Sequence, residues 1–593
     1  MSASPRAAPA QPPANPELRA AFASPRRLYM QAARQSLVIG ALMLVPSWFM
    51  FEVYGRVLNS RNETTLLWLL LVAVGTYVAL ELMEVVRLRV LYRAAQIVEQ
   101  RLRRRVFDAA FTAMLRRLPG ASTQVVADVR VATDFIYSQA VTALLDLPAS
   151  LLCLLLLYLM SPWLVLLALA AAALQAAIGA YQERNSSRPY GEANVAAAEA
   201  QLRAAGTLRN AQVIQSMGME TAMHKRWTES QRRFIVGLGN ASDKAGSASA
   251  ASKLVVSVQG SLLLGLACWL GVNNELAGGA GMAIVASILG GRVLAPLAQL
   301  IGQWRAIGGA RTAYSRVSAL LHNVPPEDAG MELPPPKGVL VAESITVVPP
   351  GSQAPVLKNV TFGALPGELL TVIGPSAAGK TSLARALIGV WPSQGGKVRL
   401  DGADVFAWHK SQLGPHMGYL SQGVELFDGS VAENIARFGK VDQDLVRQAA
   451  DEVGITAMVE ALPDGFDTQI GEDGAVLSGG QRQRLGLARA IYGSPRVVVL
   501  DEPNSSLDEA GEKALIEMIG RLKAKGTTVI AITHRSTLLA AADKLLLLVE
   551  GAVASFGPRD DVLAALKKAN EQVAAKPPVR PLAPATASAA AAP

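Results

Sequence analysis

The sequence predicts an α-helical, six-span transmembrane domain fused to an α/β domain. Three observations support this fold class. The chain has 593 residues, of which 51% are hydrophobic and 17% charged, so it is too long for one core and too apolar for an ordinary soluble enzyme. Long apolar runs crowd into the first half of the chain. The second half instead has short apolar runs that alternate with Gly-rich turns and polar helical segments, which is typical of an α/β domain.

The first part of the chain is predicted to be disordered, and the next part to cross a membrane. Residues 1–27 are rich in Ala and Pro. Residues 28–322 form the predicted transmembrane domain with six helices and two long cytoplasmic loops, because an apolar helix of ~20 residues crosses a bilayer core. No removable signal peptide is predicted, since the first run lacks a cleavage site and further spans follow it. The predicted spans are 36–54, 65–86, 135–160, 163–181, 254–272 and 281–303.

Arginines set the predicted orientation. Segments 87–117 and 183–253 are rich in charge, and short cytoplasmic loops carry the excess of Arg and Lys. Both segments and both chain termini are therefore expected in the cytoplasm. The tips near 118–123 and 202–208 are the expected elements that couple to the second domain. The net charge of +9 then reflects arginines that face an anionic inner leaflet, and no nucleic-acid partner is expected.

One charge lies inside a predicted span. Arg292 is near the middle of the sixth span, where a charge costs ~3 kcal/mol on insertion scales and is expected to face a cavity or a carboxylate. Two interpretations stay open at this stage: a place on the substrate path, or an ion pair with Asp146 or Glu81. The two cysteines, Cys153 and Cys268, both fall in predicted spans, so neither a disulfide nor a zinc cluster is expected.

A nucleotide-binding motif opens the second domain, which is assigned to residues 338–570 after a linker at 323–337 and before a low-complexity tail at 571–593. An apolar strand ends at Ile373, and the loop behind it fits GxxxxGK[ST], the P-loop pattern of an α/β P-loop NTPase domain. Its backbone N–H groups are expected to hold phosphates. The predicted nucleotide-binding residues here are Gly374, Pro375, Ser376, Ala377, Ala378, Gly379, Lys380, Thr381 and Ser382.

Two acidic residues follow a second buried strand. The run 497–500 is continuously apolar and ends in Asp501 and Glu502, and ligands bind at the carboxyl ends of such parallel strands. Asp501 is expected to hold Mg²⁺ together with the hydroxyl of Thr381. Glu502 is expected to polarise the water that attacks the γ-phosphate of ATP.

Between these two sites lies Leu477-Ser478-Gly479-Gly480-Gln481. The three motifs in this order resemble the ATP-binding cassette of ABC transporters. The resemblance implies that Lys380, Glu502 and His534 are catalytic, and that Gln422 binds nucleotide and senses the metal. It also implies that Ser478, Gly479, Gly480 and Gln481 contact ATP held by a second copy of the chain, with Asp508 communicating across the dimer. A homodimer is therefore expected, with a heterodimer left open.

The cassette departs from its relatives at two places. Ala377 occupies a P-loop position that is commonly Gly, so the loop is expected to adopt a conformation that Ala tolerates. The stretch 348–350 is Val-Pro-Pro, where an aromatic residue usually stacks on adenine, so base stacking is not predicted there.

The membrane half resembles one branch of exporters. Segments 53–66, 209–214 and 286–296 are similar to the type I protein-secretion transporters that export proteases and RTX-type proteins. This resemblance implies a bacterial inner-membrane exporter of unfolded proteins with C-terminal signals. Its implied partners are a periplasmic adaptor (membrane fusion protein), an outer-membrane channel and the secreted protein. The alternative function is a lipid or multidrug flippase that acts without adaptors.

Overall fold

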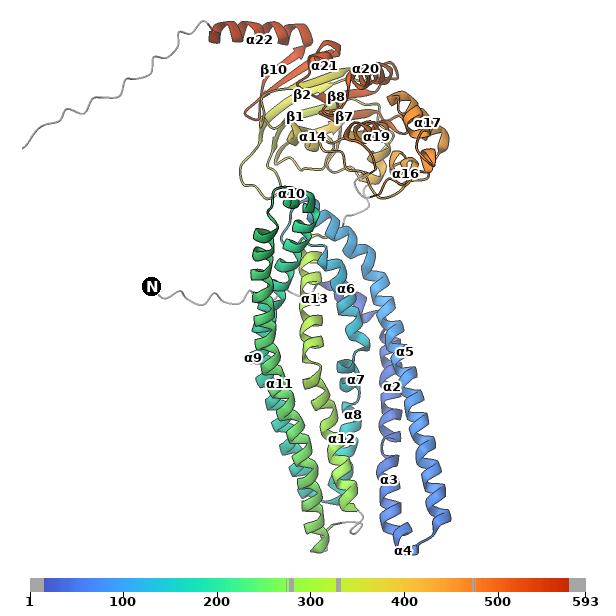
Figure 1. The fold of residues 1–593 in the computed structure, drawn as a ribbon. Helices are drawn as coiled ribbons and strands as arrows, with labels where there is room; N and C mark the ends of the chain where they lie inside the picture. The colour runs from blue at the N-terminus through green and yellow to red at the C-terminus, as the bar shows by residue number, and fades with distance from the viewer. Residues whose placement is uncertain are drawn as a thin grey trace, which may run out of the picture. The chain divides into compact units, whose positions relative to one another are not determined.

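The computed structural model describes residues 15–273, 275–276, 282–326, 332–471, 474 and 476–574. The chain forms two compact units, one of residues 1–114 and 119–325 and the other of residues 115–118 and 326–593. The first is helical and the second is built on two β-sheets (Figure 1). The end of the first unit at Pro325 falls within the expected linker 323–337.

The helical unit has six helices or helix groups that are long and apolar enough to cross a membrane. Six spans were predicted, and this prediction is confirmed in the described part of the chain. The elements are α1 (Pro16–Ala23), α2 (Arg26–Leu42), α3 (Val45–Glu52), the π-helix η1 (Val53–Val57), α4 (Leu58–Ser60), α5 (Glu63–Leu115), α6 (Gln124–Asp134), η2 (Phe135–Tyr137), α7 (Gln139–Leu145), α8 (Leu147–Met160), α9 (Pro162–Arg209), α10 (Ala211–Ser216), α11 (Glu220–Val272), α12 (Met282–Gly302) and α13 (Trp304–Asn323).

Two of the predicted spans are interrupted helices. The first span is divided between α2 and α3, and the third between α7 and α8. Pro46 and Pro148 lie in the first turns of α3 and α8. A proline is accommodated there because its missing N–H would have no partner at a helix start. Each break therefore occurs where the chain can begin a new helix without losing a hydrogen bond.

The prediction of disorder for residues 1–27 is wrong for its last part, because α1 occupies residues 16–23 and α2 begins at Arg26. The side chain of Asn15 caps α1 by accepting from the N–H of Glu17 at 2.8 Å. The backbone N–H of Asn15 donates to the hydroxyl of Ser318 at 3.2 Å, and Leu18 is 1% exposed. Packing against the rest of the unit orders this helix. Residues 1–14 lie outside the described residues.

The two tips that the sequence predicts to face the cytoplasm lie near helix ends. The first tip is the turn between α5 and α6, as expected for 118–123. The second, predicted near 202–208, falls in the last turns of α9, which ends at Arg209. Beyond it the chain turns around the short helix α10.

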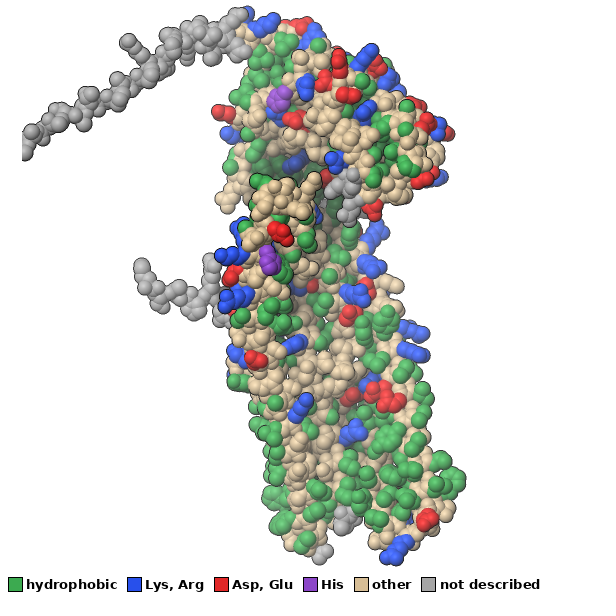
Figure 2. Space-filling view, in the orientation of Figure 1, with side chains coloured by type: hydrophobic (Ala, Val, Ile, Leu, Met, Phe, Trp, Pro, Cys, Tyr) green, Lys and Arg blue, Asp and Glu red, His purple; other side chains and the backbone are tan. Residues whose placement is uncertain are grey.

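The surface of the helical unit is strongly apolar over its membrane-spanning segments. Leu67, Trp68 and Leu82 on α5 are each more than 60% exposed. Figure 2 shows hydrophobic side chains covering much of the lower part of this unit, with charged side chains more frequent toward the α10 end. A patch of this extent indicates contact with lipid.

The second unit carries two sheets. The antiparallel sheet has the order β2-β1-β4-β5, and the larger sheet has the order β10-β9-β3-β8-β7-β6, parallel except for β10. The strands are β1 (Leu340–Val347), β2 (Leu357–Ala364), β3 (Leu369–Ile373), β4 (Gly395–Leu400), β5 (Ala403–Asp404), β6 (Met417–Leu420), β7 (Val497–Asp501), β8 (Thr528–Ile532), β9 (Lys544–Val549) and β10 (Ala552–Pro558).

Helices pack around the sheets of this unit. They are α14 (Lys380–Leu387), α15 (Lys410–Leu413), η3 (Gly414–His416), α16 (Val431–Ile435), α17 (Gln443–Val453), α18 (Thr456–Glu460), η4 (Gly465–Asp467), α19 (Gly479–Ile491), α20 (Glu509–Ala524), α21 (Ser536–Ala541) and α22 (Arg559–Ala574). Helix α22 extends four residues into the segment assigned to the tail, and residues 575–593 lie outside the described part.

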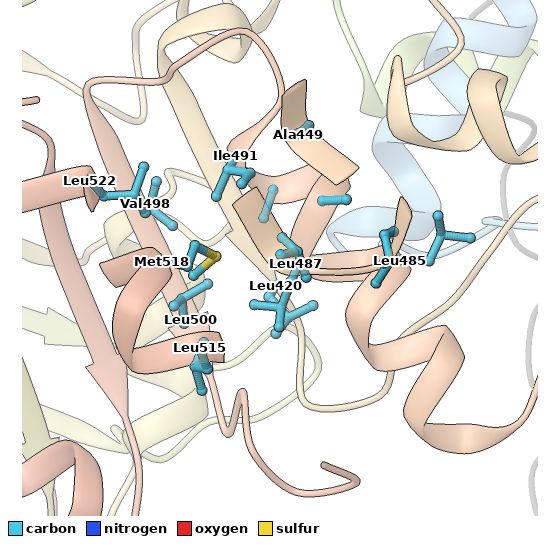
Figure 3. Packing of buried hydrophobic residues seen from close by; sticks show 14 of the residues in the cluster. Leu420, Ala449, Leu485, Leu487, Ile491, Val498, Leu500, Leu515, Met518 and Leu522 are labelled. Atoms are coloured by element: carbon cyan, nitrogen blue, oxygen red, sulfur yellow. The ribbon is translucent and has the colours of Figure 1, made fainter. Parts of the chain in front are cut away.

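The core lies on both faces of the large sheet. Along β7, Val498 and Leu500 belong to one buried cluster, and Val497 and Val499 to another. The first cluster packs against α17, α19 and α20, as the labelled side chains in Figure 3 show. A strand covered on both faces is continuously hydrophobic, which explains the apolar run seen in the sequence.

Candidate nucleotide site

The order of the large sheet gathers the predicted site residues at one edge. Strands β3, β8, β7 and β6 are parallel neighbours, with Val372 opposite Ile532, Ile532 opposite Asp501, and Leu500 opposite Leu420. All four strands therefore end at the same level. The loops behind them carry the P-loop, His534, Glu502 and Gln422, at the carboxyl ends where α/β sheets bind ligands.

The P-loop depends on glycine where the chain passes close to a neighbouring strand. Gly374 has φ +155°, and a Cβ atom there would lie 2.1 Å from the carbonyl oxygen of Leu548. The loop leads into α14, whose N-cap is Gly379 with φ +97°. The N–H groups of the first turn have no intrahelical partner, which suits them to bind an anion.

Lys380 lies across this loop. Its Nζ donates to the carbonyl oxygens of Gly374 and Pro375, each at 2.9 Å. Burial lowers the pKa of Lys380, while the nearby Glu502 and Asp501 carboxylates oppose that shift. The ammonium thus stands between the loop and the two acidic residues that end β7.

Ala377 adopts the left-handed conformation, with φ +63°. A non-glycine residue in this region costs roughly 1–2 kcal/mol. The expected conformation that Ala tolerates is therefore the left-handed one, and it carries this cost. Ala377 is exposed, so its Cβ meets no crowding that would add to the backbone strain.

Asp501 has a buried carboxylate whose oxygens lack hydrogen-bond partners among the described residues. It is 1% exposed, and neither carboxylate oxygen accepts a well-formed hydrogen bond from the described residues. Burial raises the pKa of Asp501, and the hydroxyl of Thr381 opposes that rise. An ionised carboxylate in such a position is costly unless a cation neutralises it. This donor set fits Mg²⁺, which takes one or two protein oxygens when phosphates supply others.

Glu502 and Gln422 are brought into contact although 80 positions separate them. The Gln422 Nε2 donates to Glu502 Oε2 at 3.1 Å. The backbone of Glu502 has φ +50°, and its N–H donates to the carbonyl oxygen of Ile532 at 2.9 Å. Strain of this kind persists where the surrounding structure enforces it, often at functional sites.

Gln483 was missed by the sequence reasoning. It lies on α19, is 3% exposed, and donates from Nε2 to the carbonyl oxygen of Glu502 at 3.1 Å. Its Oε1 accepts from the hydroxyl of Ser505 at 3.4 Å. The available signal was a polar residue on the buried face of an amphipathic helix. Gln483 links the helix that follows Ser478 to the loop that carries Glu502.

The remaining predicted residues occupy helix starts or exposed loops. Ser478 caps α19, with its hydroxyl accepting from the N–H of Gln481 at 3.3 Å. Ser478 and Gly479 are exposed and Gly480 is partly exposed. Asp508 caps α20 by accepting from the N–H of Gly511 at 3.0 Å. His534 is exposed, and the described residues include no hydrogen bond from it to Lys380 or Glu502.

Comparison with known proteins gives matches in both units. Residues 35–287 match the family model "ABC transporter transmembrane region", and residues 357–505 match the model "ABC transporter". The chain is 36% identical over 551 residues to the type I secretion system ATP-binding protein PrsD of Rhizobium meliloti (strain 1021). The aligned region covers 93% of this chain and 94% of PrsD.

Two further similarities are less extensive or show the fold alone. The chain is 31% identical over 319 residues to an ATP-dependent lipid A-core flippase of Burkholderia orbicola (strain AU 1054), covering 54% of this chain and 53% of the flippase. The structure of a bacterial Atm1-family ABC exporter with ATP bound superposes with a TM-score of 0.80 at 21% identity, over 94% of this chain and 100% of that one.

Proposed function

Because the chain belongs to the ABC transporter family, we propose that it is the ATPase of a type I secretion system that moves an unfolded protein across a bacterial inner membrane. The observation that carries this proposal is the 36% identity to PrsD over 93% of the chain, which includes the membrane half as well as the cassette. The cassette alone supports only the coarser statement that this is an ABC transporter with an ATPase domain.

For hydrolysis, we assign ATP to the edge where β3, β8, β7 and β6 end. The P-loop amides and Lys380 hold the phosphates, which would compete with the loop carbonyls for the Lys380 ammonium. Glu502 orients and polarises the attacking water, and Gln422 positions the Glu502 carboxylate. His534, on the loop after β8, is assigned a contact to the γ-phosphate. Catalysis here consists of positioning and electrostatic stabilisation.

The metal site is assigned to three residues. Asp501, Thr381 and Gln422 would hold Mg²⁺, with the unpaired carboxylate of Asp501 as the main anionic group. When bound, the ion neutralises negative charge that develops on the phosphates. Phosphates and water would supply the remaining ligands of the ion.

A second copy of the chain completes each site in this proposal. Ser478 caps α19, whose first residues are Gly479, Gly480 and Gln481. Ser478 and Gly479 are exposed, and Gly480 and Gln481 are partly exposed. That turn would supply N–H groups to ATP held on the P-loop of the partner, with Asp508 nearby at the start of α20. Head-to-tail pairing of two copies gives two equivalent sites, and so we propose a homodimer.

The proposed partners in transport are a periplasmic adaptor, an outer-membrane channel and a secreted protein with a C-terminal signal. The test uses the purified homodimer in proteoliposomes. ATPase turnover is measured with the C-terminal segment of a secreted protein encoded beside the transporter, and separately with added lipids or amphiphiles. Modulation by the polypeptide segment is expected. Modulation by amphiphiles alone would overturn the secretion assignment.

A flippase for lipids or drugs is the second candidate. The match to a lipid A-core flippase favours it, but that match covers about half of each chain. A flippase would transport its lipid with no adaptor or outer-membrane channel present. Lipid translocation by the purified protein in liposomes would therefore support this function over protein export.

A further inference from the structure

Arg292 lies on a cavity within the membrane-spanning region. The cavity has a volume of about 290 Å³ and is bounded by α2, α5, α7, α8 and α12. Its polar lining includes Arg87, Gln139, Asp146, Ser150, Arg292 and Gln299. Polar groups within a membrane-spanning segment are unfavourable next to lipid, and they mark sites that bind ligands or ions.

The ion pairs of the cavity leave Arg292 without a carboxylate. Arg87 is 2% exposed, and its guanidinium contacts Asp146 Oδ1 at 2.5 Å and Glu84 Oε1 at 3.5 Å. It therefore engages both acidic residues of the lining. Arg292 instead contacts the sulfur of Met43 at 3.8 Å and has no carboxylate partner among the described residues. The pairing of Arg292 with Asp146 that the sequence left open is thus taken by Arg87.

The same cavity presents acceptors as well as a cationic donor. Pro296 lies inside α12, one turn after Arg292. Because proline has no N–H, the carbonyl oxygen of Arg292 loses its usual helical donor. The hydroxyl of Ser150 is buried and has no hydrogen-bond partner in the described structure. The lining therefore combines the cationic Arg292 guanidinium with the partnerless Ser150 hydroxyl.

We propose that this cavity binds an acidic side chain of the polypeptide in transit, with Arg292 pairing to its carboxylate. The proposal rests on the function proposed above and names a substrate feature for it. An extended polypeptide brings both a carboxylate, which matches the Arg292 guanidinium, and backbone N–H groups, which could replace the donor that Pro296 does not supply to the Arg292 carbonyl oxygen. A lipid phosphate offers acceptors only and could not replace that donor.

The test compares two unfolded polypeptides that end in the same C-terminal segment of a secreted protein encoded beside the transporter. One carries Glu at several upstream positions, and its twin carries Gln at each of them. The concentration that half-stimulates ATPase turnover is measured for the homodimer in phosphatidylcholine nanodiscs. The Glu form is expected to act at about tenfold lower concentration, as a charge-assisted hydrogen bond would give.

Variants then assign the effect to Arg292. Arg292→Gln is expected to abolish the difference between the twins, and Arg292→Lys to keep part of it. The matched control is Arg104→Gln, because the Arg104 side chain is 94% exposed, and it should discriminate as the unaltered protein does. The ratio of the two concentrations is used, so any change in basal turnover cancels.

The outcomes separate this inference from the proposed function. Equal stimulation by both twins in the unaltered protein would overturn the carboxylate site and leave protein export standing. Discrimination that survives Arg292→Gln would also overturn it. If neither twin stimulates turnover, the export function itself fails. A parallel series with phosphatidylglycerol in the nanodiscs tests lipid phosphate, and an Arg292 effect seen only there would overturn the polypeptide assignment.

Discussion

Replacing Glu502 by Gln tests the proposed chemistry most directly. The change removes the charge and keeps the shape of the side chain. In the unaltered protein Gln422 Nε2 donates to Glu502 Oε2 at 3.1 Å, and the amide oxygen of the new residue can still accept this hydrogen bond. The backbone hydrogen bond from residue 502 to the carbonyl oxygen of Ile532 is unchanged. Ground-state structure and ATP binding are therefore expected to persist. Loss of a general base lowers rates by roughly 10²–10⁴-fold, or roughly 3–5 kcal/mol in the barrier.

The assay is steady-state phosphate release by the reconstituted homodimer, paired with ATP affinity measured by equilibrium binding. Turnover of Glu502→Gln should fall by about a thousandfold, with affinity changed by less than about threefold. Glu509→Gln is the matched control, since Glu509 is exposed on the first turn of α20, and it should hydrolyse ATP normally. Turnover of Glu502→Gln within about tenfold of the unaltered protein would refute the role of Glu502 as the base that activates water.

Three further predictions concern the cassette. Gly374→Ala should weaken ATP binding at least about tenfold, because its methyl group would meet the Leu548 carbonyl oxygen at 2.1 Å; unchanged equilibrium binding would contradict the described loop. Ala377→Gly should raise the free energy of unfolding in urea by up to about 1 kcal/mol, because relief of the left-handed backbone strain exceeds the extra conformational entropy that glycine loses on folding. A lower free energy of unfolding would show that this strain is absent. Arg437 donates to five backbone carbonyls around the end of α19 and the start of β6. Arg437→Gln should lower the unfolding free energy by roughly 3 kcal/mol, because these hydrogen bonds are lost. The control is Arg447→Gln, since Arg447 is exposed. An equal loss of stability in both variants would show that the hydrogen bonds of Arg437 do not stabilise the fold.

Local patterns predicted the P-loop and the apolar strand before Asp501. Both depend on neighbours in the chain, so spacing and residue type reveal them. The contact between Gln422 and Glu502 depends on β6 pairing with β7. Strand order is a long-range property that short motifs do not contain.

Errors occurred where tertiary contacts override local preference. The Ala- and Pro-rich start predicted disorder for Pro16–Ala23, but buried contacts at Leu18 and Ser318 order that helix. For Ala377 the sequence predicted only a conformation that Ala tolerates, and the structure specifies the left-handed one, with φ +63°.

The sequence by itself determined the number of candidate membrane spans and the positions of the P-loop and of the two acidic residues at the end of β7. Hydropathy over a helix length and the chemistry of short motifs are properties of contiguous residues. Only the tertiary structure decided which charge pairs with which inside the membrane. Arg87 takes Asp146 and leaves Arg292 facing the cavity, because the partner of a buried charge is set by which helices pack together.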